Sequence, residues 1–230
     1  MNRTGAPRII FISGTDTGVG KTLLTALLLQ HLRASGCHAL AMKPFCSGSR
    51  ADAVLLRAVQ ERELTLNEIN PFFFSEPLAP LVAARKHHRS IRLLAVLRRI
   101  RGLASRCQCL LVEGIGGVMV PLGEGFCVGD LIAALSCDVI LVSRNQLGTI
   151  NHTRLSYSVM QYLGIERIRT VLMAMPTADA SNVANGLMLS EMLAPTRVFS
   201  VPYLGKKAAQ LNAIKAAQKK INKTLAQILG

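Results

Sequence analysis

Short apolar runs alternate with longer amphipathic stretches along the chain. Runs rich in Ile, Val, Leu and Ala predict six β-strands, at Arg8–Ser13, Ala39–Met42, Cys109–Val112, Val139–Ser143, Thr170–Met173 and Arg197–Val201. The first run and Leu110–Val112 are continuously apolar instead of alternating with polar residues. Because such strands are buried on both faces, we expect these two at the centre of a parallel sheet.

The stretches between these runs have the length and spacing of α-helices. We expect helices over Lys21–Ala34, Ala51–Arg62, Leu78–Lys86, Ser90–Ser105, Thr149–Leu163 and Asn182–Leu193. Gly36 and Gly164 stand just after two of them, where a left-handed glycine commonly ends a helix. The alternation of strands and helices predicts an α/β fold, a doubly wound, mostly parallel sheet flanked by helices.

The C-terminal part of the chain is basic and amphipathic. Apolar residues recur there with helical spacing at Leu211, Ile214, Ile221, Leu225 and Ile228. Lysines fall between them at Lys215, Lys219, Lys220 and Lys223. This pattern predicts one basic amphipathic helix over about residues 206–229. Since no repeat, low-complexity tract or long linker divides the sequence, we expect residues 1–230 to form a single domain.

Composition narrows the class of protein. The 230 residues include 27 Lys and Arg against 13 Asp and Glu, a formal net charge of +14. That charge favours binding of polyanions such as nucleotides, nucleic acid or anionic membranes, and does not choose among them. Aromatic residues make up only 4% of the chain and Trp is absent, which argues against a base-stacking surface for nucleic acid.

Cysteine spacing and hydropathy indicate a cytoplasmic protein that does not enter a membrane. The six cysteines show no paired CxxC spacing and stand mostly in apolar runs, as buried, reduced thiols do. No apolar stretch reaches the roughly 18 residues that a membrane span needs. His87 and His88 are adjacent, so their side chains diverge by ~100° on a helix, and we expect no metal site there.

The segment Gly14–Thr22 predicts a phosphate-binding loop, because it follows an apolar strand and opens a helix. Backbone N–H groups of Gly18–Thr22 would converge on the β- and γ-phosphates of ATP. Lys21 would supply a positive charge and the Thr22 hydroxyl would ligate Mg²⁺. The loop carries one residue more than the common pattern, with Thr15 at the usual first-glycine position. It therefore indicates a variant P-loop NTPase-like fold.

Acidic and basic partners for this loop follow two other strands. Glu113 ends the buried run before Gly114, and Lys43 ends the second strand, with Asp52 soon after it. The carboxyl ends of parallel strands share one edge of a sheet, where doubly wound folds bind their ligands. Phosphoryl transfer needs carboxylates for Mg²⁺ and cations for the charge on the transferred group. We expect these side chains to lie together beside the phosphate loop.

Five segments in order resemble the dethiobiotin synthetase family. They are Gly14–Thr22, Lys43-Pro44 with Ser47-Gly48, Glu76-Pro77 with Ala79-Pro80, Val112–Gly114 with Gly116-Gly117 and Pro121-Leu122, and Leu147–His152. The resemblance spans roughly Ile9–Tyr203. It implies an ATP-dependent cyclo-ligase of biotin biosynthesis, in which 7,8-diaminononanoate takes up CO₂ as a carbamate. ATP phosphorylates the carbamate, and the second amine closes the ureido ring.

The resemblance also implies roles for individual residues. Lys21 and Lys43 would be catalytic, Thr17 and Ser47 would contact the diamine and the carbamate, and Mg²⁺ would be held by Thr22, Asp52 and Glu113. Nucleotide contacts are implied at Thr17, Gly18, Val19, Gly20, Lys21, Thr22, Leu23, Asp52, Glu113, Gly114, Ile115, Gly116, Met175, Pro176, Val201, Pro202 and Tyr203. A homodimer would bind the substrate carboxylate across its interface, at Leu147, Gly148, Thr149, Ile150 and Asn151.

This sequence departs from the family pattern at a few positions. Met175 stands where the family commonly has an asparagine that reads the adenine edge, so we expect relaxed selectivity for the base. The connection from Lys43 to Asp52 is shorter than usual, and Lys206 and Lys207 occupy positions where acidic or polar ribose contacts are expected. These departures leave open a nucleotide-binding paralogue that lacks synthetase activity.

Two other classes share the phosphate loop. DNA-partitioning ATPases carry a second lysine early in the loop, at a position that Asp16 occupies in this chain. An amide-forming ligase of the cobyrinate diamide type would need an additional glutamine-hydrolysing domain, for which the chain has no room. The synthetase is therefore the favoured function, and a partitioning ATPase remains the alternative from a different class.

Overall fold

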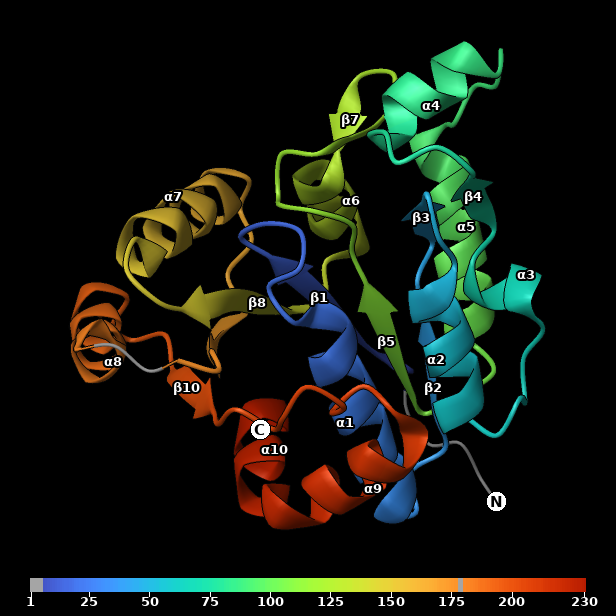
Figure 1. Cartoon of the computed structure of the whole chain (residues 1–230). Coiled ribbons are helices and arrows are strands. Elements are labelled where there is room, and N and C mark those ends of the chain that lie inside the picture. Colours follow the sequence, from blue (N-terminus) through green and yellow to red (C-terminus); the bar gives the residue numbers. More distant parts are fainter. Residues whose placement is uncertain (1–5, 178–179) are drawn as a thin grey trace.

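The apolar runs pair side by side as one parallel sheet in the computed structural model, which describes residues 6–177 and 180–230. Its strand order is β10-β9-β8-β1-β5-β2 (Figure 1). The strands are β1 (Arg8–Gly14), β2 (Ala39–Met42), β5 (Cys109–Glu113), β8 (Asp138–Asn145), β9 (Ile168–Ala174) and β10 (Val198–Val201). All five neighbouring pairs run parallel, so the predicted α/β fold with a parallel sheet is confirmed.

Strand β1 lies inside the sheet, between β5 and β8. Ile10, Phe11 and Ile12 are at most 1% exposed, and Leu110 and Leu111 of β5 are fully buried. The prediction that these two strands are central is confirmed. The chain goes from β1 outward to β2, returns through β5, and then adds β8, β9 and β10 on the other side. That reversal at β1 creates the edge where ligands of doubly wound sheets bind.

Helices cover both faces of the sheet. They are α1 (Lys21–Ala34), α2 (Ala51–Val59), α3 (Leu66–Ile69), α4 (Pro80–Lys86), α5 (Leu93–Ala104), α6 (Val128–Leu135), α7 (Thr149–Tyr162), α8 (Ser181–Met192), α9 (Leu211–Lys220) and α10 (Asn222–Leu229). Figure 1 shows α1, α9 and α10 on the near face and α5 and α6 behind the sheet. Opposite faces are expected because parallel crossovers are right-handed and the chain moves both ways from β1.

The prediction of one C-terminal helix over residues 206–229 is wrong. The segment forms two helices, α9 and α10, separated at Ile221, whose φ of −111° and ψ of 23° depart from helical values. The break lets both halves pack against α1. Ile214 of α9 and Leu225 and Ile228 of α10 are fully buried, so the apolar stripe was identified correctly but not its continuity.

Several shorter elements carry no strong signal in the sequence. The strands β3 (Phe45–Ser47) and β4 (Phe72–Phe74) pair in parallel, and β6 (Pro121–Gly123) pairs with β7 (Phe126–Cys127) in a hairpin. Helix α6 was also not predicted. Helix α2 ends at Val59 instead of Arg62 because Glu61 and Arg62 have positive φ values of 55° and 60°.

The described part of the chain, residues 6–177 and 180–230, contains no helix long and apolar enough to cross a membrane. All six cysteines are free thiols in the structure. This agrees with the reduced thiols that the sequence indicates.

Asp138 begins β8, at the edge of the sheet that is formed by the amino ends of the strands. Its contacts connect neighbouring strands with the C-terminal helix α10. Its carboxylate accepts hydrogen bonds from Arg8, at 2.9 and 3.1 Å, and from Arg167, at 2.8 Å. Arg8 also donates to the carbonyl of Leu229 at the end of α10. Burial alone would raise the pKa of Asp138, but hydrogen bonds from Arg8 and Arg167 hold it below its ordinary value of 3.8.

Replacing Asp138 is expected to weaken the dependence of the free energy of unfolding on pH in the acidic range. A depressed pKa in the folded state stabilises the protein above the ordinary value of 3.8, and that contribution is lost as the pH falls through the folded-state pKa. We expect Asp138→Asn to lower the free energy of unfolding by roughly 1–3 kcal/mol near pH 7 and less at pH 3. Urea unfolding between pH 3 and 7 measures this, with exposed Glu166→Gln as the control. A constant difference across that range would contradict the assignment.

Candidate active site

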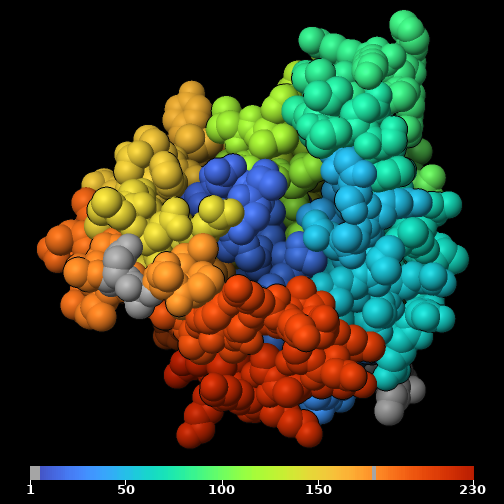
Figure 2. Space-filling view, in the orientation of Figure 1, coloured from blue at the N-terminus to red at the C-terminus, as the bar shows by residue number. Residues whose placement is uncertain are grey.

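The phosphate loop lies where β1 meets α1, as the sequence predicts. Gly18 and Gly20 have φ values of 71° and 101°, which glycine adopts at little cost. Helix α1 begins at Lys21 without a side-chain cap on its first turn. Its first N–H groups are therefore available to an anion. Figure 2 shows the blue segment that contains the loop at the surface, between the yellow-green and cyan parts of the chain.

The Lys21 side chain folds back over the loop. Its ammonium donates to the carbonyls of Asp16 and Gly116, at 2.7 and 2.8 Å, and the residue is only 6% exposed. Burial, followed by repulsion from Lys43, lowers the pKa of Lys21 to about 8. The ammonium is therefore still the main form at neutral pH, and a phosphate chain would favour it further.

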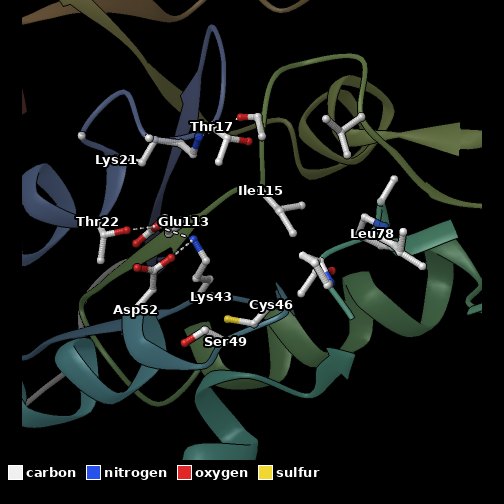
Figure 3. Close-up of a pocket in the computed structure, with 18 of the residues that line it drawn as sticks. Thr17, Lys21, Thr22, Lys43, Cys46, Ser49, Asp52, Leu78, Glu113 and Ile115 are labelled. Atoms are coloured by element: carbon white, nitrogen blue, oxygen red, sulfur yellow. Dashed lines mark hydrogen bonds and ion pairs between the residues drawn. The ribbon is translucent and has the colours of Figure 1, made fainter. Parts of the chain in front are cut away.

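Lys43, Asp52 and Glu113 form one ion cluster beside this loop (Figure 3). The Lys43 ammonium donates to Glu113 Oε1 and contacts Asp52 Oδ2 at 2.8 Å. Burial alone would lower the pKa of Lys43, but the two carboxylates hold it above its ordinary value. The structure thus brings together three side chains that the sequence places at one edge of the sheet.

Glu113 is the buried centre of this cluster. It is completely shielded from solvent at the end of β5, and its Oε1 also accepts a 2.6 Å hydrogen bond from the Thr22 hydroxyl. Its Oε2 is buried without a hydrogen-bond donor in the part of the chain that the structure describes. A carboxylate oxygen in that position, with Thr22 and Asp52 beside it, suits a hard cation such as Mg²⁺. The described residues form no larger cluster of His, Cys, Asp and Glu that could hold a metal.

These groups face one cavity of about 610 Å³. Twelve of the residues predicted for the site line it, namely Thr17, Gly18, Gly20, Lys21, Thr22, Leu23, Lys43, Ser47, Asp52, Glu113, Ile115 and Gly116. The hydroxyl of Ser47 is buried without a hydrogen-bond partner among the described residues. It is therefore available to a ligand in the cavity.

Part of the cavity wall was not predicted as a site. Cys46, Ser49, Pro77, Leu78, Ala79, Pro80 and Val120 line it as well. The segment Glu76–Pro80 belongs to the family pattern, and that signal could have identified this apolar wall. Burial raises the pKa of the Cys46 thiol to about 12, so Cys46 is a neutral wall residue and not a nucleophile at neutral pH.

Other predicted site residues lie outside the lining of this cavity. The Val19 side chain is buried against Gly14 of the same loop, and Gly114 packs against Phe11. The predicted adenine contacts, Met175, Pro176, Val201, Pro202 and Tyr203, are placed at or just beyond the carboxyl ends of β9 and β10. The predicted carboxylate contacts, Leu147, Gly148, Thr149, Ile150 and Asn151, surround the N-terminus of α7. These two sets remain predictions.

The histidines lie outside the cavity lining. His87 Nε2 lies 2.8 Å from a carboxylate oxygen of Glu76, and His152 lies on the exposed side of α7. His31 is buried on α1 and contacts Asn222 of α10 at 2.7 Å.

Comparison with known proteins identifies the family of this chain. A family model described as an AAA domain matches residues 8–210. The ATP-dependent dethiobiotin synthetase of Anaeromyxobacter dehalogenans strain 2CP-1 is 36% identical, over 92% of this chain and 98% of that protein. The enzyme of the same name from Bacillus licheniformis is 41% identical, over 70% of this chain and 71% of that protein.

The chain belongs to the dethiobiotin synthetase family. The resemblance to this family is thereby confirmed, and so is the prediction of an ATP-dependent ligase.

Solved structures with a similar fold include proteins of other functions. The MinC:MinD cell division protein complex of Aquifex aeolicus has a TM-score of 0.64 at 12% identity, over 97% of this chain and 96% of that chain. A ParA family ATPase of Chlorobium tepidum TLS has a TM-score of 0.59 at 16% identity, with the same coverage. At such identities the likeness shows a shared P-loop fold alone, so the partitioning ATPase gains no functional support from it.

Asn70 fixes the loop that carries Lys43. Its buried side-chain amide donates to the carbonyls of Lys43 and Pro44, at 3.0 and 3.2 Å. Arg50 in turn donates to the side-chain and backbone oxygens of Asn70, at 2.9 and 2.8 Å. The position of Lys43 in the cavity therefore depends on a polar brace behind it.

Removing this brace is expected to destabilise the protein. Asn70→Ala would take the side-chain donor from the Lys43 carbonyl, while the Pro44 carbonyl keeps its hydrogen bond from the Phe72 N–H. We expect the free energy of unfolding to fall by about 1–3 kcal/mol. Asn67→Ala is the matched control, because Asn67 accepts a hydrogen bond from the same Arg50 on the exposed surface. We expect the control to change stability by less than about 0.5 kcal/mol. Equal losses in urea unfolding would contradict a special role of Asn70.

Proposed function

We propose that this chain catalyses the ATP-dependent closure of a ureido ring on 7,8-diaminononanoate with CO₂, the dethiobiotin synthetase reaction. The observation that carries the proposal is the ammonium of Lys43 in the same cavity as the phosphate loop. Membership of the family supports the choice of reaction. A cation beside the phosphate-binding N–H groups suits an anionic substrate that accepts a phosphoryl group.

The chemistry has three steps that these charges would assist. One amine attacks CO₂ and loses a proton, which gives a carbamate. A carbamate oxygen attacks the γ-phosphorus of ATP and releases ADP, and the second amine then attacks the carbonyl carbon and expels phosphate. Lys21 and Lys43 would offset the negative charge on the transferred phosphoryl group, an electrostatic contribution that is often the largest in such reactions.

We propose Mg²⁺ as the metal cofactor, held by Thr22, Asp52 and Glu113. The buried Oε2 of Glu113, which lacks a donor among the described residues, supports this choice. When bound, the ion would neutralise charge on the nucleotide phosphates. The Lys43 ammonium contacts both carboxylates, Asp52 and Glu113. Its positive charge would offset part of their negative charge and keep the net charge of the cavity small.

Substrate contacts would come from Thr17 in the phosphate loop and from the wall opposite it. The exposed Thr17 and the Ser47 hydroxyl, which has no hydrogen-bond partner among the described residues, are suited to the diamine and the carbamate. Pro77, Leu78 and Ala79 give this wall an apolar surface, as an alkyl chain requires.

The base of ATP would lie beyond the ends of β9 and β10. Met175 and Pro176 follow β9, while Pro202 and Tyr203 follow Val201 at the end of β10. Because β9 and β10 are neighbours, these segments share the ligand-binding edge of the sheet. A thioether at Met175 supplies no donor and acceptor pair for the adenine edge, so selectivity would depend on backbone groups.

We propose that two chains form the complete enzyme. Several large apolar side chains on or beside α7 and α8 are exposed, namely Leu147 (82%), Leu155 (60%), Tyr162 (91%), Val183 (75%) and Leu187 (70%). Such a surface is typical of an interface. In a homodimer, the N–H groups around Gly148 and Thr149 could bind the substrate carboxylate of the partner subunit. The six free thiols support a cytoplasmic location.

Replacing Lys43 tests the function itself. Purified protein would be incubated with diaminononanoate, bicarbonate, Mg²⁺ and ATP, and dethiobiotin detected by mass. We expect Lys43→Gln to reduce product formation by about 10²-fold or more while nucleotide binding is retained. Lys86→Gln removes an exposed lysine and serves as the control. Unchanged turnover in Lys43→Gln would contradict its role, and nucleotide binding without any product in the wild type would favour the inactive paralogue.

The dimer can be tested by one charge on α7. Leu155→Asp places a carboxylate on the exposed apolar surface, where folding of one chain is little affected. We expect sedimentation to show a dimer for the wild type and a monomer for the variant, with loss of synthetase activity and retention of ATP binding. Arg98→Met on the exposed face of α5 should remain dimeric. A monomeric wild-type enzyme with full activity would contradict the shared site.

A further inference from the structure

Two side chains from neighbouring strands of the sheet contact the phosphate loop. Arg144 of β8 and Met173 of β9 are register partners in the sheet. The Arg144 guanidinium donates from Nε and Nη2 to the Gly18 carbonyl, at 3.3 and 3.2 Å. Met173 packs against Gly20, where an added Cβ would lie 3.0 Å from its Cγ. One cross-strand pair therefore contacts both left-handed glycines of the loop.

The contact with Arg144 fixes the direction of a phosphate-facing N–H group. A trans peptide is planar, so the carbonyl of Gly18 and the N–H of Val19 point in opposite directions. With the carbonyl held on the Arg144 side of this peptide, the Val19 N–H points to the opposite side, where it would be offered to a phosphate. The guanidinium also polarises this peptide, which makes its N–H a stronger donor to an anion.

The geometry of Gly18 agrees with this arrangement. A Cβ at Gly18 would lie 2.7 Å from Arg144 Nη2, so a side chain there would displace the guanidinium from its contact with the Gly18 carbonyl. Gly18 has a φ of 71°. Glycine has less intrinsic preference for one backbone conformation than any other residue. A loop with two such residues needs contacts from outside to hold its N–H groups in place.

We propose that Arg144 is a positioning residue for the nucleotide phosphates, acting through the Gly18–Val19 peptide. This role rests on the ATP-binding part of the proposed function and not on ring closure. Arg144 is outside the lining of the cavity and outside every segment of the family pattern given above. Its forked guanidinium suits a carbonyl that must be held by two donors, and the single ammonium of a lysine does not reproduce that geometry.

Binding of a non-hydrolysable ATP analogue tests the proposal by calorimetry. We expect Arg144→Met to raise the Kd about tenfold, in line with the loss of hydrogen bonds from a charged donor. Arg144→Lys should recover less than half of that loss on a logarithmic scale, and binding of adenosine, which lacks phosphates, should not change. Arg98→Met removes the same charge from the exposed face of α5 and should bind like the wild type.

Exchange of the Val19 amide with solvent separates positioning from general attraction by charge. We expect the analogue to slow this exchange in the wild type, measured by NMR, and to slow it far less in Arg144→Met. Equal affinities of Arg144→Met and the wild type would overturn the proposal, and so would full recovery in Arg144→Lys, which would assign the effect to charge alone. Failure of the wild type to bind the analogue would contradict the nucleotide site itself. Absence of dethiobiotin with these binding results intact would count only against the synthetase reaction.

Discussion

Glu113 holds a carboxylate at the fully buried end of β5, and the arrangement of the site follows from the need to compensate it. An unpaired charge in such a place would cost several kcal/mol, about 3–5 when one partner of a buried pair is removed. Lys43 and Thr22 supply that compensation from the end of β2 and the start of α1. Because an apolar residue would serve stability as well, the buried charge supports the cation site proposed above.

The same constraint explains why the strand order matters. Glu113 can meet Lys43 only because β5 pairs with β2, and it can meet Thr22 only because β5 also pairs with β1. Asn70 and the short pair of β3 and β4 then fix the chain that leaves Lys43. The ion cluster therefore depends on contacts between segments that are distant in the sequence.

The sequence predicted the features whose signals are local. Hydrophobic runs predict the six sheet strands and α1, and the spacing of Gly14, Gly18 and Gly20 predicts the phosphate loop. The convergence of Lys43, Asp52 and Glu113 follows from their positions at or after the ends of strands. Helix α6 was missed because its eight residues are apolar on most sides, without a clear helical period. The break at Ile221 was missed because its apolar spacing continues through the turn.

Arg144 shows what local pattern cannot supply. Nothing in its neighbourhood distinguishes it from the other basic residues, and its contact with Gly18 exists only because β8 pairs with both β1 and β9 in a fixed register. The apolar wall at Pro77–Pro80 is similar, because only the folded chain brings it opposite the phosphate loop. Met175 and the N-terminus of α7 were identified from the family pattern, and their roles depend on a bound ligand or on a second chain.

The C-terminal helices give this protein a particular order of assembly. His31 on α1 meets Asn222 on α10 across 191 residues of sequence, and Ile214, Leu225 and Ile228 cover the same helix. During synthesis on a ribosome, α1 and its phosphate loop emerge early but must wait for α10 before their outer surface is covered. Contacts of this length slow folding. Nascent chains would therefore expose the apolar side of α1 for most of translation, a period in which a chaperone could bind it.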